Sequence, residues 1–194
     1  MSGPVSAPQH LTSEHDVSAF ECTVPELNDW LKRRALQNEG SRASRTFVVI
    51  GGGRVVGYYA LATVAVAHAV ATGKVRRNMP EPIPVMVLAR LAVDRAHQGT
   101  GLGCALLRDA LLRTLAVAEA VGIRAILLHA ISEEAKRFYV HHGFAESPVD
   151  PLTTMITLAD VEKAMGIGED RRPQPVLPSA RSRRADRRPG RYTS

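Results

Sequence analysis

Cysteine is scarce in this chain, and long hydrophobic runs are missing. The 194 residues include only two cysteines, Cys22 and Cys104, which lie far apart and match no metal-ligand spacing. The histidines form no HExxH pattern and no cluster with cysteine. These shortages predict neither a disulfide framework nor a metal site, so a reducing, cytoplasmic compartment is expected. No run of about 18 uncharged apolar residues indicates a membrane span, and residues 1–10 lack the pattern of a signal peptide.

Acidic residues are nearly absent from the C-terminal end of the chain. Residues 171–194 hold eight arginines and one acid, which leaves 17 basic and 18 acidic residues in positions 1–170. The net charge of +6 therefore belongs to this end, which is also rich in proline. The composition predicts one folded domain, residues 1–168, followed by a disordered Arg/Pro-rich tail, residues 169–194. Such a tail is either a solvated extension or an arm that contacts RNA.

Hydrophobic periodicity predicts an α/β fold, with a mixed central sheet flanked by helices. An amphipathic helix is expected over residues 25–38. An antiparallel hairpin follows, with strands 46–50 and 55–66 around the glycines 51–53. The nearly continuous apolar run 85–93 is typical of a central strand buried on both faces. The other expected elements are helix 101–121, strand 125–131, helix 133–142, strand 152–158 and helix 159–165.

A glycine-rich turn, Gln98–Gly103, lies between the expected central strand and the next helix. Glycines there let backbone N–H groups approach a ligand, and the helix N-terminus adds positive partial charge, so the turn suits a pyrophosphate. Taken alone, it is compatible with a dinucleotide turn or a tight connection. No acidic residue follows about 20 residues later, which makes it a poor dinucleotide fingerprint.

Three single side chains also stand out. Tyr139 follows Phe138 on the expected helix 133–142, and an aromatic pair on a short helix belongs either to the core or to a site. Arg90 interrupts an apolar strand, so it is expected to be paired or to face a site. His129 lies on another apolar strand and is interpreted as a hydrogen-bonded histidine of the core or of a site wall.

The two motifs together resemble GNAT acetyltransferases. The matching segments are Leu91–Asp94, the loop with Gln98, Gly101 and Gly103, and the segment with Ala135, Phe138, Tyr139, Gly143 and Phe144. The resemblance implies a GNAT fold with acetyl-CoA as co-substrate, a catalytic Tyr139 near the thioester sulfur, and loop amides on the pyrophosphate. The contacts with acetyl-CoA that it implies are Leu91, Ala92, Val93, Gln98, Gly99, Thr100, Gly101, Gly103, Cys104, Ser132 and Phe138.

Residues 11–165 further resemble the GNAT toxins of type II toxin–antitoxin modules. The likeness includes Pro25–Leu27, Ala43–Val48, Ala89–Asp94, His129–Ser132 and Ser147–Pro151. It implies acetylation of the amino group of an aminoacyl-tRNA, which stops translation, and neutralisation by a ribbon–helix–helix antitoxin. It also implies a homodimer that meets operator DNA only through the antitoxin complex. The alternative is a GNAT enzyme that acts on a protein N-terminus or a small-molecule amine.

The expected chemistry needs a neutral amine and a protonated leaving sulfur. A tyrosine hydroxyl stays protonated at neutral pH, so Tyr139 suits the role of acid. The sequence reveals no evident base, which favours an α-amino group over the more basic lysine side chain. A tRNA substrate also needs cations for its phosphates. The candidates are Arg33, Arg34, Arg45, Lys74, Arg76, Arg77 and Arg90.

Overall fold

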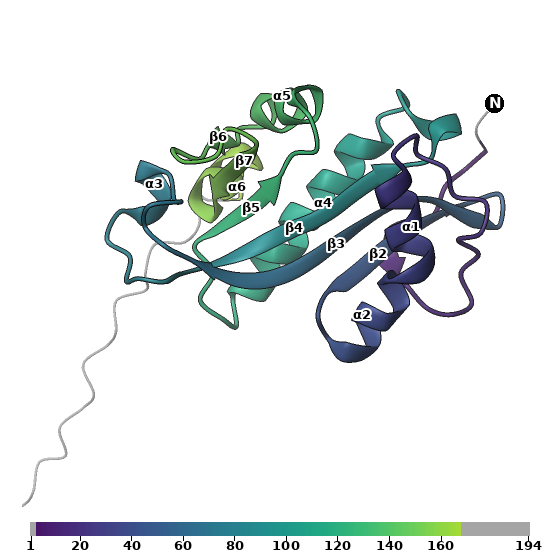
Figure 1. Ribbon diagram of the computed structural model, residues 1–194, viewed down its shortest axis with the longest axis horizontal. Coiled ribbons are helices and arrows are strands. Elements are labelled where there is room, and N and C mark those ends of the chain that lie inside the picture. Colours follow the sequence, from purple (N-terminus) through teal and green to yellow (C-terminus); the bar gives the residue numbers. More distant parts are fainter. Residues whose placement is uncertain (1–2, 168–194) are drawn as a thin grey trace, which may run out of the picture.

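The computed structural model describes residues 3–167 as one twisted sheet with helices on both faces (Figure 1). The expected tail, residues 169–194, lies outside the described residues. The sheet order is β1-β2-β3-β4-β5-β7-β6, with β4 and β5 parallel and every other neighbouring pair antiparallel. The predicted mixed α/β sheet is therefore confirmed. Within residues 3–167, no helix combines the length and apolar character needed to cross a membrane.

Two neighbouring strands in the middle of the sheet, β3 and β4, are its longest. The strands are β1 (Gln9–His10), β2 (Arg45–Gly51), β3 (Arg54–Val66), β4 (Ile83–Val93), β5 (Ala125–His129), β6 (Ala145–Glu146) and β7 (Thr153–Thr157). The helices are α1 (Pro25–Arg33), α2 (Ala35–Ser41), α3 (Gly73–Arg76), α4 (Leu102–Ala118), α5 (Glu133–His141) and α6 (Leu158–Ala164), with a 3-10 turn at Arg95–His97.

The two faces of the sheet are covered by different segments (Figure 1). Helix α4 packs on one face, where the largest hydrophobic cluster includes Leu106, Leu107 and Tyr59. Helix α1 and residues 11–22 cover the other face, over a second cluster that includes Tyr58. At Gly57, a Cβ would lie 3.1 Å from Leu106 Cδ1, so the absence of a side chain lets α4 sit close to β3.

The expected helix 25–38 is two helices, and this prediction is wrong at its centre. Arg34 adopts φ −118° and ψ −30°, which interrupts the helix between α1 and α2. Leu31 and the fully buried Ala35 lie four residues apart and join the same cluster beneath, so the apolar stripe continues across the interruption and does not reveal it. Strand β1 and helix α3 were also not expected, because two and four residues are too short to carry a periodic signal.

The parallel pair β4–β5 is the feature that opens the sheet. Val85–Val87 pair with Ala125–Leu127, and the ladder between the two strands ends there although both strands continue. On its other side β4 remains paired with β3 up to Val93. The register of that pairing shifts at Ala89, which has no partner on β3 and forms a β-bulge. Strands β4 and β5 therefore separate beyond Val87 and Leu127.

Candidate functional site

A cavity of about 770 Å³ lies where β4 and β5 separate. It is lined mainly by apolar side chains, with a few polar groups facing it, as is typical of ligand sites. Its lining comprises Val24, Glu26 and Leu27 at the start of α1, Val87–Leu91 of β4, Leu128–Ser132 at the end of β5, and Ala135 and Tyr139 of α5. The cavity thus joins the edge of β4 to the N-terminal helix and to α5.

Tyr139 reaches the cavity from α5. Ser132 starts this helix by accepting a hydrogen bond from the Ala135 amide through its side chain, at 3.1 Å. The Tyr139 ring makes edge contacts with Phe138 and Phe144, with ring centroids 5.1 and 5.8 Å apart. Burial raises the pKa of its hydroxyl to about 12, so the phenol is neutral near pH 7. The structure therefore presents a protonated hydroxyl at the wall of the cavity.

The glycine-rich turn lies beyond the end of β4, at the N-terminus of α4. Gly99 and Gly101 have φ of 72° and 88°, a conformation that only glycine adopts without strain. No side chain caps α4, so the amides of its first turn are left available to a ligand. The 17-residue helix adds its dipole at this point. This geometry suits a phosphate group, as the sequence predicts.

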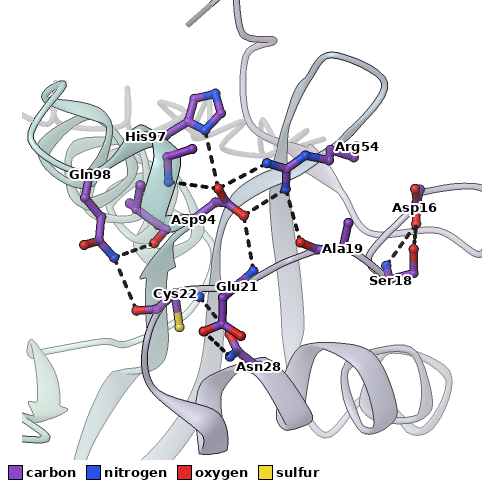
Figure 2. A network of polar contacts seen from close by, with 12 residues as sticks. Asp16, Ser18, Ala19, Glu21, Cys22, Asn28, Arg54, Asp94, His97 and Gln98 are labelled. Carbon is purple, nitrogen blue, oxygen red and sulfur yellow. Dashed lines mark hydrogen bonds and ion pairs between the residues drawn. The ribbon is translucent and has the colours of Figure 1, made fainter.

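A buried carboxylate holds the turn against the N-terminal segment (Figure 2). Asp94 accepts hydrogen bonds from Arg54 at 2.8 and 3.2 Å, from the Glu21 amide at 3.2 Å and from the Ala96 amide at 3.1 Å. The Arg54 guanidinium lowers the pKa of this carboxyl to about 2, although burial acts in the opposite direction. Asp94 is therefore ionised at any physiological pH.

The side chains of Gln98 and Asn28 extend this network to α1 (Figure 2). Gln98 donates one side-chain hydrogen bond to the Val93 carbonyl at 3.0 Å and another to the Cys22 carbonyl at 3.2 Å. Asn28 of α1 donates to Glu21 at 2.8 Å and accepts from the Cys22 amide at 2.9 Å. The polar network thus connects the glycine-rich turn to the helix that walls the cavity.

The predicted cofactor contacts fall into separate groups. Leu91 and Ser132 line the cavity, whereas Ala92 points into the cluster under α1 and Val93 packs against the cluster under α4. Phe138 does not line the cavity but packs between Tyr139 and His142. The remaining predicted contacts, which follow one another beyond the end of β4, are Gln98, Gly99, Thr100, Gly101, Gly103 and the exposed Cys104.

The predicted tRNA-binding cations do not form one cluster. Arg33, Arg34 and Arg45 are exposed around α1, α2 and the start of β2, where Arg45 pairs with Glu39 at 2.9 Å. The second group, on and after α3, is formed by Lys74, Arg76 and Arg77, and Lys74 pairs with Asp160 of α6 at 3.2 Å. Figure 1 places α3 and α2 toward opposite ends of the sheet.

Arg90 is the one predicted cation that lines the cavity. Its guanidinium lies 5.6 Å from the centre of the Trp30 ring, and Nη1 donates to the Ala89 carbonyl at 2.6 Å. Arg90 therefore has partners and also lines the cavity, so its position is compatible with either of the two alternatives.

Two further polar groups line this cavity: Glu26, which the sequence analysis did not single out, and His129, for which it left the core and a site wall open. Glu26 lines it from the first turn of α1. His129 lines it from the end of β5, with its side chain 66% exposed, so it belongs to a site wall and not to the core. His129 also contacts Thr153 and Asp150, and only the pairing of β5 with β7 brings these residues together. Within the described part of the chain, no group of three or more His, Cys, Asp or Glu side chains is arranged to hold a metal.

The comparisons with known proteins agree with this geometry. The acetyltransferase (GNAT) domain family matches residues 42–146. A tRNA-acetylating toxin of Mycobacterium tuberculosis (strain ATCC 25618 / H37Rv) is 52% identical over 166 residues, which are 86% of this chain and 99% of the relative.

Two solved structures of AtaT complexes share the fold at 25% identity. AtaT complexed with acetyl-methionyl-tRNAfMet has a TM-score of 0.77 and covers 84% of this chain and 99% of its own. The AtaT–AtaR complex bound to DNA has a TM-score of 0.68, with 81% and 98% covered. The separated central strands, the glycine-rich turn and the family match lead to one conclusion: this chain belongs to the GNAT family of acetyltransferases.

Proposed function

We propose that this chain is a toxin that transfers the acetyl group of acetyl-CoA to the α-amino group of an aminoacyl-tRNA and so blocks translation. The observation that carries the proposal is the 52% identity to a tRNA-acetylating toxin over 99% of that protein's length. The cavity supports the proposal, because the edge of β4 on which we place the thioester, the neutral hydroxyl of Tyr139 and the start of α1 all line it.

The donor half of the site consists largely of backbone. We assign the pantetheine arm and the acetyl carbonyl of acetyl-CoA to the β4 edge at Leu91–Val93, where the strand is separated from β5. We assign the pyrophosphate to the amides of Gln98–Cys104 at the start of α4. Ser132 then flanks the arm at the start of α5, and Phe138, which lies outside the cavity, contributes through its edge contact with the Tyr139 ring. Amide hydrogens that point at the carbonyl oxygen stabilise the negative charge that develops during transfer.

Tyr139 acts in this proposal as the acid that protonates the leaving sulfur. Its hydroxyl is neutral because burial raises its pKa to about 12, and no residue in the described part of the chain accepts a hydrogen bond from it. A free hydroxyl at the cavity wall can therefore turn toward the thiolate as the carbon–sulfur bond breaks.

We place the amine acceptor, the aminoacyl end of the tRNA, on the side of the cavity that is lined by Arg90 and the start of α1. Arg90 lies within the cavity, close enough to contact the 3′ end of a nucleic acid whose aminoacyl group enters it. The groups Arg33–Arg34–Arg45 and Lys74–Arg76–Arg77 supply two positive regions outside the cavity for tRNA phosphates. These contacts position the substrate, whereas the cavity itself selects the amine.

We further propose that the toxin is a cytoplasmic homodimer neutralised by a ribbon–helix–helix antitoxin. The cytoplasm contains its substrate, and both cysteines are free thiols, as expected in a reducing compartment. Operator DNA would be contacted only through the toxin–antitoxin complex. Co-expression with the antitoxin, followed by measurement of the mass of the complex in solution, tests the partner and the stoichiometry together.

The decisive experiment is transfer of labelled acetyl groups from acetyl-CoA to a pool of aminoacylated tRNAs. Uncharged tRNA, peptides and spermidine are assayed in parallel. We expect label on charged tRNA alone, with Tyr139→Phe reducing kcat about 100-fold or more while acetyl-CoA still binds. Tyr59→Phe is the matched control, because it removes a buried hydroxyl that contacts Asp109, away from the cavity.

Each outcome of this experiment has a distinct meaning. Label on peptide or polyamine instead of tRNA would refute the toxin assignment and support the alternative GNAT activity. Full turnover in Tyr139→Phe would remove this residue from the acid role.

Salt dependence separates the two positive regions. Turnover on tRNA should fall as salt rises, because phosphate contacts release counterions. Arg76→Gln with Arg77→Gln, and Arg33→Gln with Arg34→Gln, are compared at several salt concentrations. The pair that contacts tRNA should flatten the logarithmic salt slope by about 0.7–0.9 for each lost contact. Unchanged slopes in both double variants would place the tRNA elsewhere on the surface.

A further inference from the structure

His129 occupies a position in the cavity that the proposed roles leave unexplained. It is the last residue of β5 and pairs in register with Thr153 of β7. Its ring therefore leaves the sheet at the point where β5 has separated from β4, and it lines the same cavity as Tyr139. The side chain is 66% exposed, so its position does not result from core packing.

The hydrogen bonds around His129 determine which ring nitrogen carries the proton. Thr153 Oγ1 donates to Asp150 Oδ2 at 2.6 Å, and the same oxygen lies 2.6 Å from His129 Nδ1. A hydroxyl has one proton, and here the proton is used by the carboxylate. Thr153 must then accept from His129, so Nδ1 carries a hydrogen, and in the neutral ring Nε2 is the nitrogen that keeps a lone pair.

Asp150 holds this arrangement because it stays ionised. Its pKa is lowered chiefly by the hydrogen bond from Thr153, then by the Leu152 amide, which donates to Oδ1 at 3.0 Å. Asp150 Oδ2 lies 3.9 Å from His129 Nδ1, too far for a direct hydrogen bond. Thr153 therefore relays the orientation from a carboxylate to an imidazole, as the carboxylate of a catalytic triad does directly.

We infer that His129 is the general base of the reaction, with Nε2 accepting a proton from the α-ammonium group of the aminoacyl-tRNA. This inference rests on the proposed function, since it takes an α-amino group as the acceptor. Imidazole exchanges protons near neutral pH, which suits this acceptor. Within residues 3–167, Nε2 makes no hydrogen bond to protein, so the lone pair is free to meet a substrate.

The other charged and titratable groups of the cavity wall are compatible with this role. Glu26, on α1, is the one acid among the described residues that line the cavity, and it can hold the ammonium group by charge. Arg90, on β4, adds a positive charge to the wall of the same cavity. Tyr139, on α5, is itself neutral. The base and the acid thus line one cavity.

The protons and electrons balance without a further reactant. The ammonium group gives one proton to His129 Nε2, and the nitrogen lone pair then forms the bond to the carbonyl carbon of the thioester. The carbon–sulfur bond breaks, its electron pair leaves on sulfur, and Tyr139 protonates the thiolate. The second nitrogen proton returns to the tyrosinate through solvent, and His129 releases its own proton to bulk water. The products are the acetylated amine and coenzyme A.

The first test compares His129→Ala with wild type over a range of pH, on the aminoacyl-tRNA that wild type acetylates. At neutral pH we expect kcat to fall about 100-fold or more, with acetyl-CoA binding and melting temperature unchanged. The deficit should shrink as pH rises above the pKa of the amine, because the substrate then arrives deprotonated. Added imidazole should restore part of the rate.

Three further variants separate chemistry from structure. Thr153→Val removes the relay and should lower kcat about tenfold or more with an intact base, whereas Thr153→Ser keeps the hydroxyl and should approach wild type. His141→Gln is the matched control, because this exposed histidine ends α5 outside the cavity. A deficit in His129→Ala that is equal at every pH, or that imidazole leaves unchanged, would overturn the inference.

A second measurement does not depend on the substrate. Nitrogen-15 NMR of the histidine side chains reports the tautomer of His129 directly in wild type, with Thr153→Val as the reference. We expect the hydrogen on Nδ1 at neutral pH, and a hydrogen on Nε2 would overturn the inference. If wild type does not acetylate aminoacyl-tRNA, the proposed function fails, whereas this measurement still decides whether His129 presents a free base.

Discussion

The Asp94 carboxylate allows a quantitative prediction about stability and pH. Arg54 lowers its pKa from 3.8 to about 2 in the folded protein. A lowered native pKa stabilises the fold fully above the unfolded value, and the contribution is lost as pH falls through 3.8 toward 2. The shift corresponds to about 2 kcal/mol at neutral pH, and about half of this contribution is lost by pH 3. The side chain is 4% exposed, so solvent screens little of this interaction.

Asp94→Asn removes this charge with little change in shape. We expect urea denaturation to give a free energy of unfolding about 2 kcal/mol below wild type at pH 7 and about 1 kcal/mol below it at pH 3. Asp16→Asn is the control, because Asp16 is exposed and its hydrogen bonds go to the nearby Ser18. A gap between wild type and Asp94→Asn that stays constant from pH 7 to pH 3 would refute the reasoning, since the cost would then be one of geometry.

Two other substitutions test the turn and the helix behind it. Gly101→Ala places a side chain at a residue with φ 88°, so the affinity for acetyl-CoA, measured by calorimetry, should fall about tenfold or more. Gly40→Ala is the control and should leave this affinity unchanged, because Gly40 lies on α2 with open space around it. Asp109→Ala leaves the buried Tyr59 hydroxyl without its acceptor and Arg113 without its ion pair. The free energy of unfolding should therefore fall by about 1–3 kcal/mol. Acetyl transfer should persist, because none of these three residues lines the cavity. Normal affinity in the first variant, or normal stability in the second, would contradict these assignments.

The parts of the site that the sequence predicts are those carried by contiguous residues. The turn Gln98–Gly103 and the helix with Tyr139 each contain their own signal, because glycines and an aromatic pair stand at fixed spacing within one segment. The hairpin of β2 and β3 is predictable for the same reason. Arg90 is conspicuous because a charge inside an apolar strand needs an explanation.

The parts that escaped prediction depend on contacts between distant segments. Asp94 bonds Arg54, which lies 40 positions earlier, and His129 meets Thr153, which lies 24 positions later. Nothing local to either residue reveals its partner, since the contact exists only after the strands pair. The break at Arg34 also escaped prediction, because the apolar stripe of Leu31 and Ala35 continues across it and marks no interruption.

The separation of β4 from β5 also affects which amino-acid substitutions the protein tolerates. Past Val87, the hydrogen-bonding groups of β4 that face β5 are main-chain atoms released from the ladder, and every amino acid except proline supplies the same atoms. Conservative substitutions along this edge should therefore leave the proposed contacts with the thioester intact. Mutations that inactivate the proposed toxin should instead accumulate at Gly99, Gly101 and Tyr139. The two glycines have positive φ, and Tyr139 supplies the neutral hydroxyl of the proposed reaction. Sequencing of survivors of forced expression would reveal this bias as a map of the site.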